Sequence, residues 1–378
     1  MAAPQILHVI NTASVGGGGE HVYTLLEACP HSTSLLVGES GPLLARARRL
    51  GVPTHVVPFM GPRWDLRWAW RLARFVRAQQ PDLVHLHGTR SAFLYNLARW
   101  VAPSLPPSIY TEHAFSHRQA LPSWRKRLHL YAEWLATQWH ERVVCVARGD
   151  REELLSRGWR AADSVRFIPN GVDIERFKGN AAARRRARRG LGIDTKALLV
   201  GVVARLVPQK AVDQAVHALS RALSADSRLR AVIVGDGPER DAIAREVERQ
   251  SQSGKIQLLG GRSDVPELLA ACDIYLLTSR WEGLPIGLLE AMAAARPVVA
   301  TAAPGTRELV QHERNGLLAP VDAPEGIARA VLRAAADRKL RRRLGAAARR
   351  TVQQRYDKAH FVNATFRLYE EVLGSFPG

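Results

Sequence analysis

The chain has 378 residues, more than one hydrophobic core usually organises, so two domains are expected. Its composition, 46% hydrophobic and 24% charged, excludes a disordered chain. The 54 Lys and Arg residues exceed the 35 Asp and Glu residues and give a net charge of +19, which attracts nucleotide phosphates, anionic lipids or nucleic acid.

No membrane span or secretion signal is expected. No window approaches the ~20 apolar residues that a span requires, and residues 1–10 lead directly into an apolar strand. The three cysteines, Cys29, Cys145 and Cys272, show no CxxC or Cys/His metal spacing. We expect them to be reduced core thiols of a cytoplasmic protein.

Short apolar runs alternate with longer amphipathic stretches, as in parallel βαβ units. The runs of the first half are 6–10, 34–37, 54–57, 83–86 and 143–146. The series restarts with the runs 198–203, 231–234, 256–259, 274–277 and 297–300. The sequence therefore predicts an α/β chain with two doubly wound, Rossmann-like domains.

The composition between the two series sets the expected boundaries. We predict an N-terminal domain over residues 1–178, a linker over 179–190, a C-terminal domain over 191–355, and a helix over 356–378 that packs across the domain junction. The five arginines of the linker could bind an anion, but a solvated linker and first helix is the preferred interpretation.

Four glycines, Gly16 to Gly19, follow the first predicted strand and precede a helical run that begins at Glu20, and Gly17, Gly18 and Gly19 are the candidate donor-binding residues. Such a loop allows backbone N–H groups and a helix N-terminus to approach a phosphate. The spacing does not match the GxGxxG fingerprint, which argues against an NAD-dependent dehydrogenase.

The second half carries candidate groups at the ends of successive strands. Arg205 and Lys210 follow the first of them, where two cations would neutralise a diphosphate. Gly235 lies in a tight turn after the next strand, and Arg262 and Val265 follow the strand after that, where backbone groups could meet a planar base.

The segment 279–292 is the most specific functional motif of the chain. It holds two acids, Glu282 and Glu290, around a loop that turns into a helix. The free N–H groups at the start of that helix would bind an anion, and the residues there are Gly283, Leu284, Pro285 and Ile286. Carboxylates suit polyols because they accept several hydrogen bonds, so we expect Glu290 to bind ribose and Glu282 to bind the sugar.

These segments resemble the GT-B-fold glycosyltransferases of family 4, also called group 1. The resemblance covers essentially the whole chain and rests on 200–210, 233–239, the Glu-x7-Glu pair Glu282 and Glu290, the glycine loop, the turn 168–173, and His113 in Tyr-Thr-Glu-His. Three departures are Ala211 where glycine is usual, Ala294–Ala295–Arg296 in place of Cys-Gly-Lys, and Pro304 before Gly305.

The resemblance implies that the two domains face each other across a donor-binding cleft. It also implies that Arg205 and Lys210 hold the donor diphosphate, Glu290 the ribose, Glu282 the transferred sugar and His113 a sugar hydroxyl. It further implies a hexosyltransferase that retains anomeric configuration, uses a UDP- or GDP-sugar, and needs no cofactor and no metal. The lack of an obvious DxD pair fits this.

The sequence indicates less about the acceptor substrate than about the donor. Eight of the nine tryptophans lie in the first domain, and basic aromatic segments run over 63–77 and 123–140. Each could lie on an anionic membrane, although a helix packed on the sheet is the preferred interpretation of the first.

We expect a glycan or lipid-linked acceptor in cell-envelope or polysaccharide synthesis, on the inner face of the membrane. A soluble small-molecule acceptor is the alternative. A nucleic-acid-binding protein is a remote one, because no motif for nucleic acid occurs.

Overall fold

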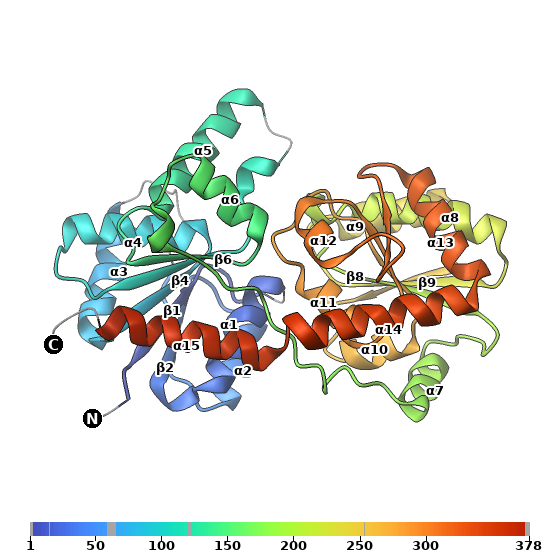
Figure 1. Cartoon of the computed structure of the whole chain (residues 1–378), viewed down its shortest axis with the longest axis horizontal. Helices are drawn as coiled ribbons and strands as arrows, with labels where there is room; N and C mark the ends of the chain where they lie inside the picture. Colours follow the sequence, from blue (N-terminus) through green and yellow to red (C-terminus); the bar gives the residue numbers. More distant parts are fainter. Residues whose placement is uncertain (1–2, 15, 59–65, 120–121, 253, 375–378) are drawn as a thin grey trace. The chain divides into compact units, whose positions relative to one another are not determined.

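A computed structural model describes residues 3–14, 16–58, 66–119, 122–252 and 254–374 (Figure 1). The chain forms two compact units. Residues 1–170 and 359–378 make the first, and residues 171–358 make the second. The boundaries thus fall at 170/171 and 358/359 rather than at the ends of the 179–190 segment.

The first unit is built on a parallel seven-stranded sheet of order β3-β2-β1-β4-β5-β6-β7. Its strands are β1 Ile6–Ile10, β2 Thr33–Val37, β3 Thr54–Val56, β4 Leu83–His87, β5 Ser108–Glu112, β6 Arg142–Cys145 and β7 Val165–Phe167. Every residue of β1, β4 and β5 is buried, as expected for a parallel sheet covered on both faces.

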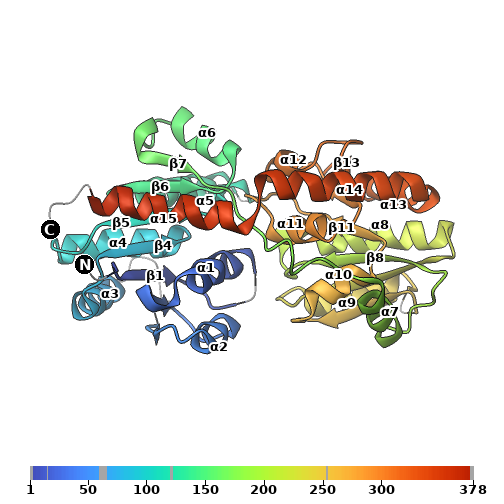
Figure 2. The same ribbon diagram turned by 60° about the horizontal axis from the view of Figure 1, so that its bottom comes forward.

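Helices cover both faces of this sheet. They are α1 Gly17–Ala28, α2 Pro42–Arg49, α3 Leu66–Gln79, α4 Thr89–Val101, α5 Ser123–Thr137, α6 Arg148–Ser156 and the last helix, α15 Lys358–Gly374. Short 3-10 turns lie at Pro30–Ser32, Ser116–Arg118 and Ala162–Ser164. Helix α15 lies along the sheet in Figures 1 and 2, and its apolar face packs on residues of β1, β4, β5 and β6.

The second unit has a parallel six-stranded sheet of order β10-β9-β8-β11-β12-β13. Its strands are β8 Leu198–Val203, β9 Leu229–Val234, β10 Ile256–Gly260, β11 Ile274–Leu277, β12 Val298–Thr301 and β13 Leu317–Ala319. Its helices are α7 Ala181–Gly190, α8 Val212–Ala225, α9 Arg240–Arg249, α10 Val265–Ala271, α11 Ile286–Ala293, α12 Pro304–Leu309, α13 Pro324–Ala336 and α14 Arg338–Arg355, with a 3-10 turn at Pro208–Lys210. Both sheets confirm the predicted α/β architecture.

The 179–190 segment differs from the expected solvated linker. Most of it is helix α7, which lies against α10 inside the second unit. Arg184 donates to the carbonyls of Ala270, Ala271 and Cys272, and Arg188 and Arg184 share the carboxylate of Asp273. These arginines satisfy the last carbonyls of α10, which a helix end otherwise leaves open.

The ten predicted strands all occur, within one or two residues at each end, and three strands were not predicted. The missed strands are β5, β7 and β13. Strand β5, Ser-Ile-Tyr-Thr-Glu, contains three polar residues that are nevertheless buried, so an apolar run does not mark it. Strands β7 and β13 have only three residues each.

The three cysteines are free thiols. Cys145 and Cys272 are buried, as predicted, whereas Cys29 is partly exposed. None of the described helices is long and apolar enough to cross a membrane.

Candidate active site

In doubly wound sheets, ligands bind at the carboxyl ends of the strands, where the strand order reverses. In the second sheet this reversal lies between β8 and β11, and in the first it lies between β1 and β4. Lys210 and Glu282 follow β8 and β11, and the glycine loop follows β1. The predicted groups therefore lie at the reversal point of each sheet.

Hydrogen bonds tie the loop after β8 to the loop after β11. Arg280 donates its backbone N–H to the Gln209 carbonyl at 2.9 Å, and the Gln209 amide donates to the Trp281 carbonyl at 3.0 Å. The Thr278 hydroxyl donates to the carbonyl of Lys210 at 3.0 Å. These bonds fix the backbone on both sides of Lys210 and Glu282.

Lys210 and Glu282 form an ion pair, with Lys210 Nζ 2.5 Å from Glu282 Oε1. The same oxygen accepts the Ser279 hydroxyl at 2.6 Å. Glu282 is only 4% exposed, so its charge needs these partners. The sequence indicated that both residues face a ligand, but not that they bond to each other.

Arg205 also follows β8 and, unlike Lys210, has an exposed side chain. It forms no ion pair with any residue that the structure describes. An unpaired guanidinium beside a paired ammonium leaves a net positive charge at this edge of the sheet, which favours a diphosphate.

The helix after Glu282 begins slightly later than predicted. Pro285 is the N-cap of α11, with φ −71° and ψ 112°, and the first helical residue is Ile286. Leu284 is 4% exposed and Ile286 is 8% exposed, so this helix start is packed into the domain. Gly305 approaches the Gly283 carbonyl so closely that a Cβ there would overlap it.

Glu290 lies just over one turn into α11 and is partly exposed rather than buried. Its carboxylate and that of Glu282 both lie near the buried Tyr275. Burial is the main cause that raises the pKa of the Tyr275 phenol, and the charges of Glu290 and Glu282 raise it further. The structure thus brings the two predicted acids to one region of the second unit.

The turns after β9 and β10 adjoin each other. The Gly235 N–H donates to the Gly260 carbonyl at 2.8 Å. Gly235 has φ +142°, and a Cβ there would overlap the Ala204 carbonyl oxygen, so only glycine fits. Arg262 is exposed and binds Asp264 at 2.7 Å, and Val265 begins α10. The paired Arg262 is therefore a weaker candidate for base contact than the backbone around it.

In the first unit, the glycine loop is the first turn of a helix. Helix α1 begins at Gly17 rather than at Glu20, and a Cβ at Gly19 would lie 2.8 Å from the Ser14 carbonyl oxygen. A Cβ at Gly18 would lie 3.9 Å from His113 Cδ2. The loop and His113, predicted separately, therefore lie side by side, with helix N–H groups next to an imidazole.

His113 belongs to a cluster of five histidines that the sequence analysis missed. The others are His8, His21, His85 and His87, all of which are buried. Burial and the neighbouring His21 hold the pKa of His113 well below its usual value, so it is a neutral imidazole at pH 7. The available signal was the alternation of His85 and His87 along one strand, opposite His8 on the next.

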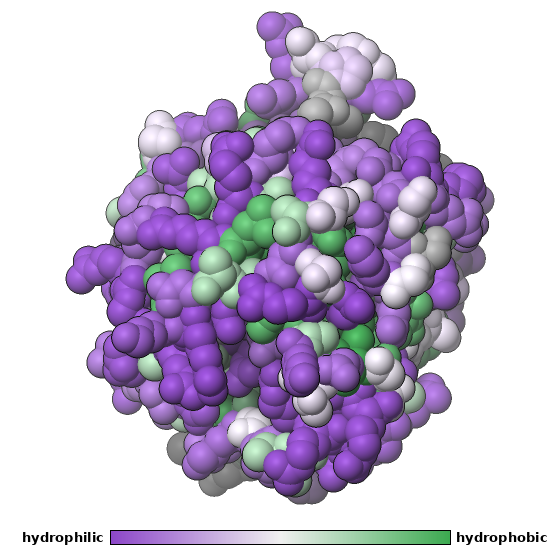
Figure 3. All heavy atoms as spheres, turned by 90° about the vertical axis from the view of Figure 1, so that its right-hand side faces the viewer, coloured by the Kyte–Doolittle hydropathy of each residue, from purple (hydrophilic) through white to green (hydrophobic). Residues whose placement is uncertain are grey.

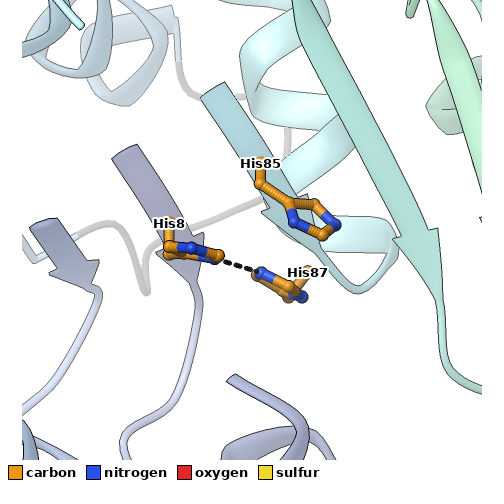
Figure 4. Close-up of side chains that lie close together, drawn as sticks. All are labelled: His8, His85 and His87. Carbon is orange, nitrogen blue, oxygen red and sulfur yellow. Dashed lines mark hydrogen bonds between the residues drawn. The ribbon is translucent and has the colours of Figure 1, made fainter. Parts of the chain in front are cut away.

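Within the cluster, His8 Nδ1 and His87 Nε2 share a hydrogen bond of 3.0 Å, and His85 lies beside them (Figure 4). His85 uses both ring nitrogens, with the Tyr369 hydroxyl at 2.6 Å and the Thr111 hydroxyl at 2.7 Å. Helix α15 thus reaches the cluster through Tyr369. Arg63 and Trp64 of the predicted basic aromatic segment lie outside the described residues.

Comparisons with known proteins show which family the chain resembles. The family model of glycosyl transferases group 1 matches residues 183–351, and that of glycosyltransferase family 4 matches residues 15–176. The chain is 28% identical over 319 residues to the UDP-Gal:alpha-D-GlcNAc-diphosphoundecaprenol alpha-1,3-galactosyltransferase of Escherichia coli, covering 81% of each chain. It is 32% identical over 207 residues to the GDP-mannose-dependent alpha-(1-6)-phosphatidylinositol monomannoside mannosyltransferase of Mycobacterium tuberculosis, covering 52% of this chain and 54% of that one.

The fold also matches solved structures. HepE from Anabaena, in complex with UDP and glucose, superposes with a TM-score of 0.85 at 21% identity, covering 98% of this chain and 100% of that one. The two family models together match residues of both units. The chain belongs to the group 1 glycosyltransferases of family 4, enzymes of the GT-B fold that transfer a sugar.

Proposed function

We propose that this enzyme moves a hexosyl unit from a UDP- or GDP-sugar to an acceptor hydroxyl with retention of configuration. The observation that carries the proposal is the constellation of Arg205, the Lys210–Glu282 pair and Glu290 around the β8–β11 reversal point. Cations for a diphosphate and carboxylates for polyols are the groups that a nucleotide sugar requires. The relatives named for UDP-Gal and GDP-mannose donors support this class of donor.

Each residue has a proposed role. Arg205 and Lys210 hold the diphosphate, together with the N–H groups that open α11 after Gly283, and Glu290 holds the ribose. The base meets the turns at Gly235 and between Arg262 and Val265, in part through backbone groups. In the first unit, the N–H groups of Gly17, Gly18 and Gly19 approach the donor, and His113 binds a hydroxyl of the sugar through its neutral ring.

In the proposed reaction the bond from the anomeric carbon to the diphosphate breaks first, leaving an oxocarbenium-like sugar. The acceptor hydroxyl attacks from the same face, and its proton passes to the departing diphosphate. Glu282 is paired with Lys210 and Ser279, which suits binding and charge stabilisation rather than attack as a nucleophile. The two cations and the start of α11 supply the positive charge, so no divalent metal is required.

Donor identity is tested first by thermal unfolding and donor hydrolysis with UDP-, GDP-, ADP- and dTDP-sugars, with EDTA or with magnesium. Stabilisation by one nucleotide class in EDTA supports the proposal and identifies the base. A requirement for magnesium would contradict the metal-independent mechanism. The product's anomeric configuration, read from the ¹H coupling at the anomeric carbon, tests retention.

We further propose a glycan or lipid-linked acceptor of the cell envelope, met by the enzyme at the inner face of an anionic membrane. Exposed large hydrophobic side chains of the described residues all lie between Val56 and Trp139, in the first unit. The face drawn in Figure 3 is by contrast mostly hydrophilic. At the start of α5, residues 123–128 are all exposed, including Trp124 (64%) with Arg125, Lys126 and Arg127 beside it. Aromatic and basic side chains on one exposed helix are suited to a lipid interface.

Helix α3 supports this surface only in part. Leu72 and Val76 are buried, and Trp68 and Phe75 pack against the same core, so its main apolar face covers the sheet. Leu66 and Trp70 remain exposed at 56% and 54%. The structure therefore favours the packed interpretation for α3, and α5 is the stronger membrane candidate.

Co-sedimentation with liposomes tests the membrane contact. The enzyme should sediment with vesicles that contain anionic lipid and much less with neutral ones, and Trp124→Ala with Arg125→Glu should reduce this binding. Trp100→Ala is the matched control, since Trp100 is 76% exposed at the end of α4. Equal binding by all variants would contradict the α5 surface, and absence of binding would favour the soluble small-molecule acceptor.

A further inference from the structure

The histidine cluster of the first unit contains more nitrogen ligands than donor binding requires. His21, His87 and His113 each offer a ring nitrogen, and these three nitrogens lie within 4.8 Å of one another. The three residues come from α1, from the end of β4 and from the turn after β5, all at the carboxyl edge of the sheet. Imidazole is the protein ligand that suits zinc and similar transition metals.

Each of these histidines also keeps one ring nitrogen with no hydrogen-bond partner. These atoms are His21 Nε2, His87 Nδ1 and His113 Nε2, and all three are inaccessible to solvent. A buried polar atom without a partner destabilises the folded state. Each ring therefore keeps one nitrogen that an ion could bind without competing with a hydrogen bond.

The other nitrogens of the set are already arranged as ligand supports. His21 Nδ1 lies 2.8 Å from Asn170 Oδ1, and His87 Nε2 lies 3.0 Å from His8 Nδ1. Metal-bound histidines generally use their second nitrogen in such a bond, which fixes the ring orientation and the tautomer. Two of the three ligands therefore have their supporting bond before any ion enters.

A second triad, His8, His85 and His87, satisfies the same distance criterion (Figure 4). It fits less well, because both nitrogens of His85 are bonded to Tyr369 and Thr111. An ion there would break a hydrogen bond of His85, whereas His21, His87 and His113 each have a nitrogen without a hydrogen-bond partner. His113 is also partly exposed, whereas all three members of the second triad are buried.

We propose that His21, His87 and His113 form a binding site for a transition-metal ion such as Zn²⁺, and that the bound ion inhibits sugar transfer. Zinc bonds of about 2.0–2.1 Å place tetrahedral nitrogens about 3.4 Å apart, so the rings close in slightly around the ion. Three protein ligands leave a fourth position for water. The inhibitory part rests on the proposed function, because an ion bound to the His113 ring would compete with the donor sugar for that side chain.

The metal site is tested without reference to activity. Chelator-treated enzyme, with no donor present, is titrated with Zn²⁺ by calorimetry and with Co²⁺ by visible absorption. We expect one ion per chain and the intense visible bands of four-coordinate Co²⁺. His21→Leu and His87→Leu should each weaken binding by at least about 100-fold, and Asn170→Leu by about 10-fold to 100-fold.

Two substitutions in different elements keep the test informative if one variant does not fold, and unfolding curves identify the folded ones. His312→Ala is the control for surface binding, since His312 is half exposed in the second unit and should leave the affinity unchanged. No stoichiometric Zn²⁺ binding, or binding that both cluster variants retain, would overturn the site.

Inhibition is measured separately. Zn²⁺ should lower transfer by the wild-type enzyme, EDTA should restore it, and the residual activity of His87→Leu should be insensitive to Zn²⁺. Zn²⁺ binding without inhibition would overturn only the inhibitory part. If no donor supports transfer, the proposed function fails, while the calorimetric result still decides the metal site.

Discussion

The ammonium of Lys210 and the carboxylate of Glu282 lie 2.5 Å apart in a site where Glu282 is almost inaccessible to water. Removing one partner leaves a buried charge uncompensated. Lys210→Met should therefore lower the free energy of unfolding by roughly 3–5 kcal/mol, as well as abolishing most transfer.

A double substitution separates the two effects. Lys210→Met with Glu282→Gln removes both charges and should recover most of the stability measured by urea unfolding, but none of the transfer. If the double variant transfers sugar as the wild-type enzyme does, the pair is structural and the diphosphate assignment of Lys210 is wrong.

Glu290 provides a test of ribose binding. Glu290→Gln keeps the size of the side chain but removes the charge that strengthens its hydrogen bonds, a loss of roughly 1.5–3 kcal/mol. We expect kcat/KM for the nucleotide sugar to fall by roughly 10-fold to 150-fold. Steady-state kinetics measure this, with Glu325→Gln, on the exposed side of α13, as a control that should behave like the wild type.

Two of the departures from the family pattern lie where the backbone is left-handed. Ala211 has φ +47° and Ala295 has φ +56°, so each L-residue adopts a conformation that glycine adopts at lower cost. Ala295 follows the end of α11, and its N–H donates to the Met292 carbonyl at 3.0 Å. Such a position after a helix end is usually glycine.

Ala295→Gly should therefore raise the free energy of unfolding by roughly 0.5–1 kcal/mol, measured by urea titration. Ala294→Gly is the matched control, because Ala294 has φ −71° and glycine there should instead cost about 0.5–1 kcal/mol. Equal effects of the two substitutions would show that backbone strain at Ala295 is negligible.

Buried histidines make the first unit sensitive to acid. Burial is the main cause that lowers the pKa of His8 to about 3, of His21 to about 4 and of His140 to about 3. The unfolded chain takes up protons near the ordinary value of 6.5 and the folded chain does not. Stability should thus fall as the pH drops from about 6.5 toward 4, by up to ~1.4 kcal/mol per pH unit for each histidine.

One carboxyl opposes this trend. Burial, and to a lesser extent the charge of Glu133, raises the pKa of Glu112 from its ordinary value of 4.5 to about 7. Between pH 4.5 and 7 the folded state therefore holds a proton on Glu112 that the unfolded state has released. This group adds stability as the pH falls through 7. Urea unfolding between pH 7.5 and 5 should show a net loss, and a steeper one in Glu112→Gln. A stability independent of pH would contradict the neutral histidines.

The sequence predicted the architecture well because buried parallel strands are apolar and continuous. The strands at 6–10, 198–203 and 274–277 agree with the structure at both ends. Strand β5 was missed because Tyr110 and Glu112, although buried, are polar and satisfy each other through a hydrogen bond. Such pairing depends on tertiary structure, which a hydropathy pattern does not record.

The predicted site residues follow the carboxyl ends of strands, and the contacts between them could not be predicted. The motif pointed to Lys210 and Glu282 independently, and the ion pair arises only because β8 and β11 are neighbours in the sheet. The histidine cluster was missed for the same reason. Its members are spread from His8 to His113 in sequence and meet through strand order and helix α1.

The chain leaves its first unit after Asn170 and returns to it only at Ala359. During synthesis, the second unit is therefore complete as a continuous segment before the ribosome releases α15, and until then part of one face of the first sheet has no helix packed on it. Tyr369, the partner of His85, therefore emerges only after the whole second unit. A mutation that terminates the chain after residue 358 would consequently damage the unit whose first 170 residues had already been made.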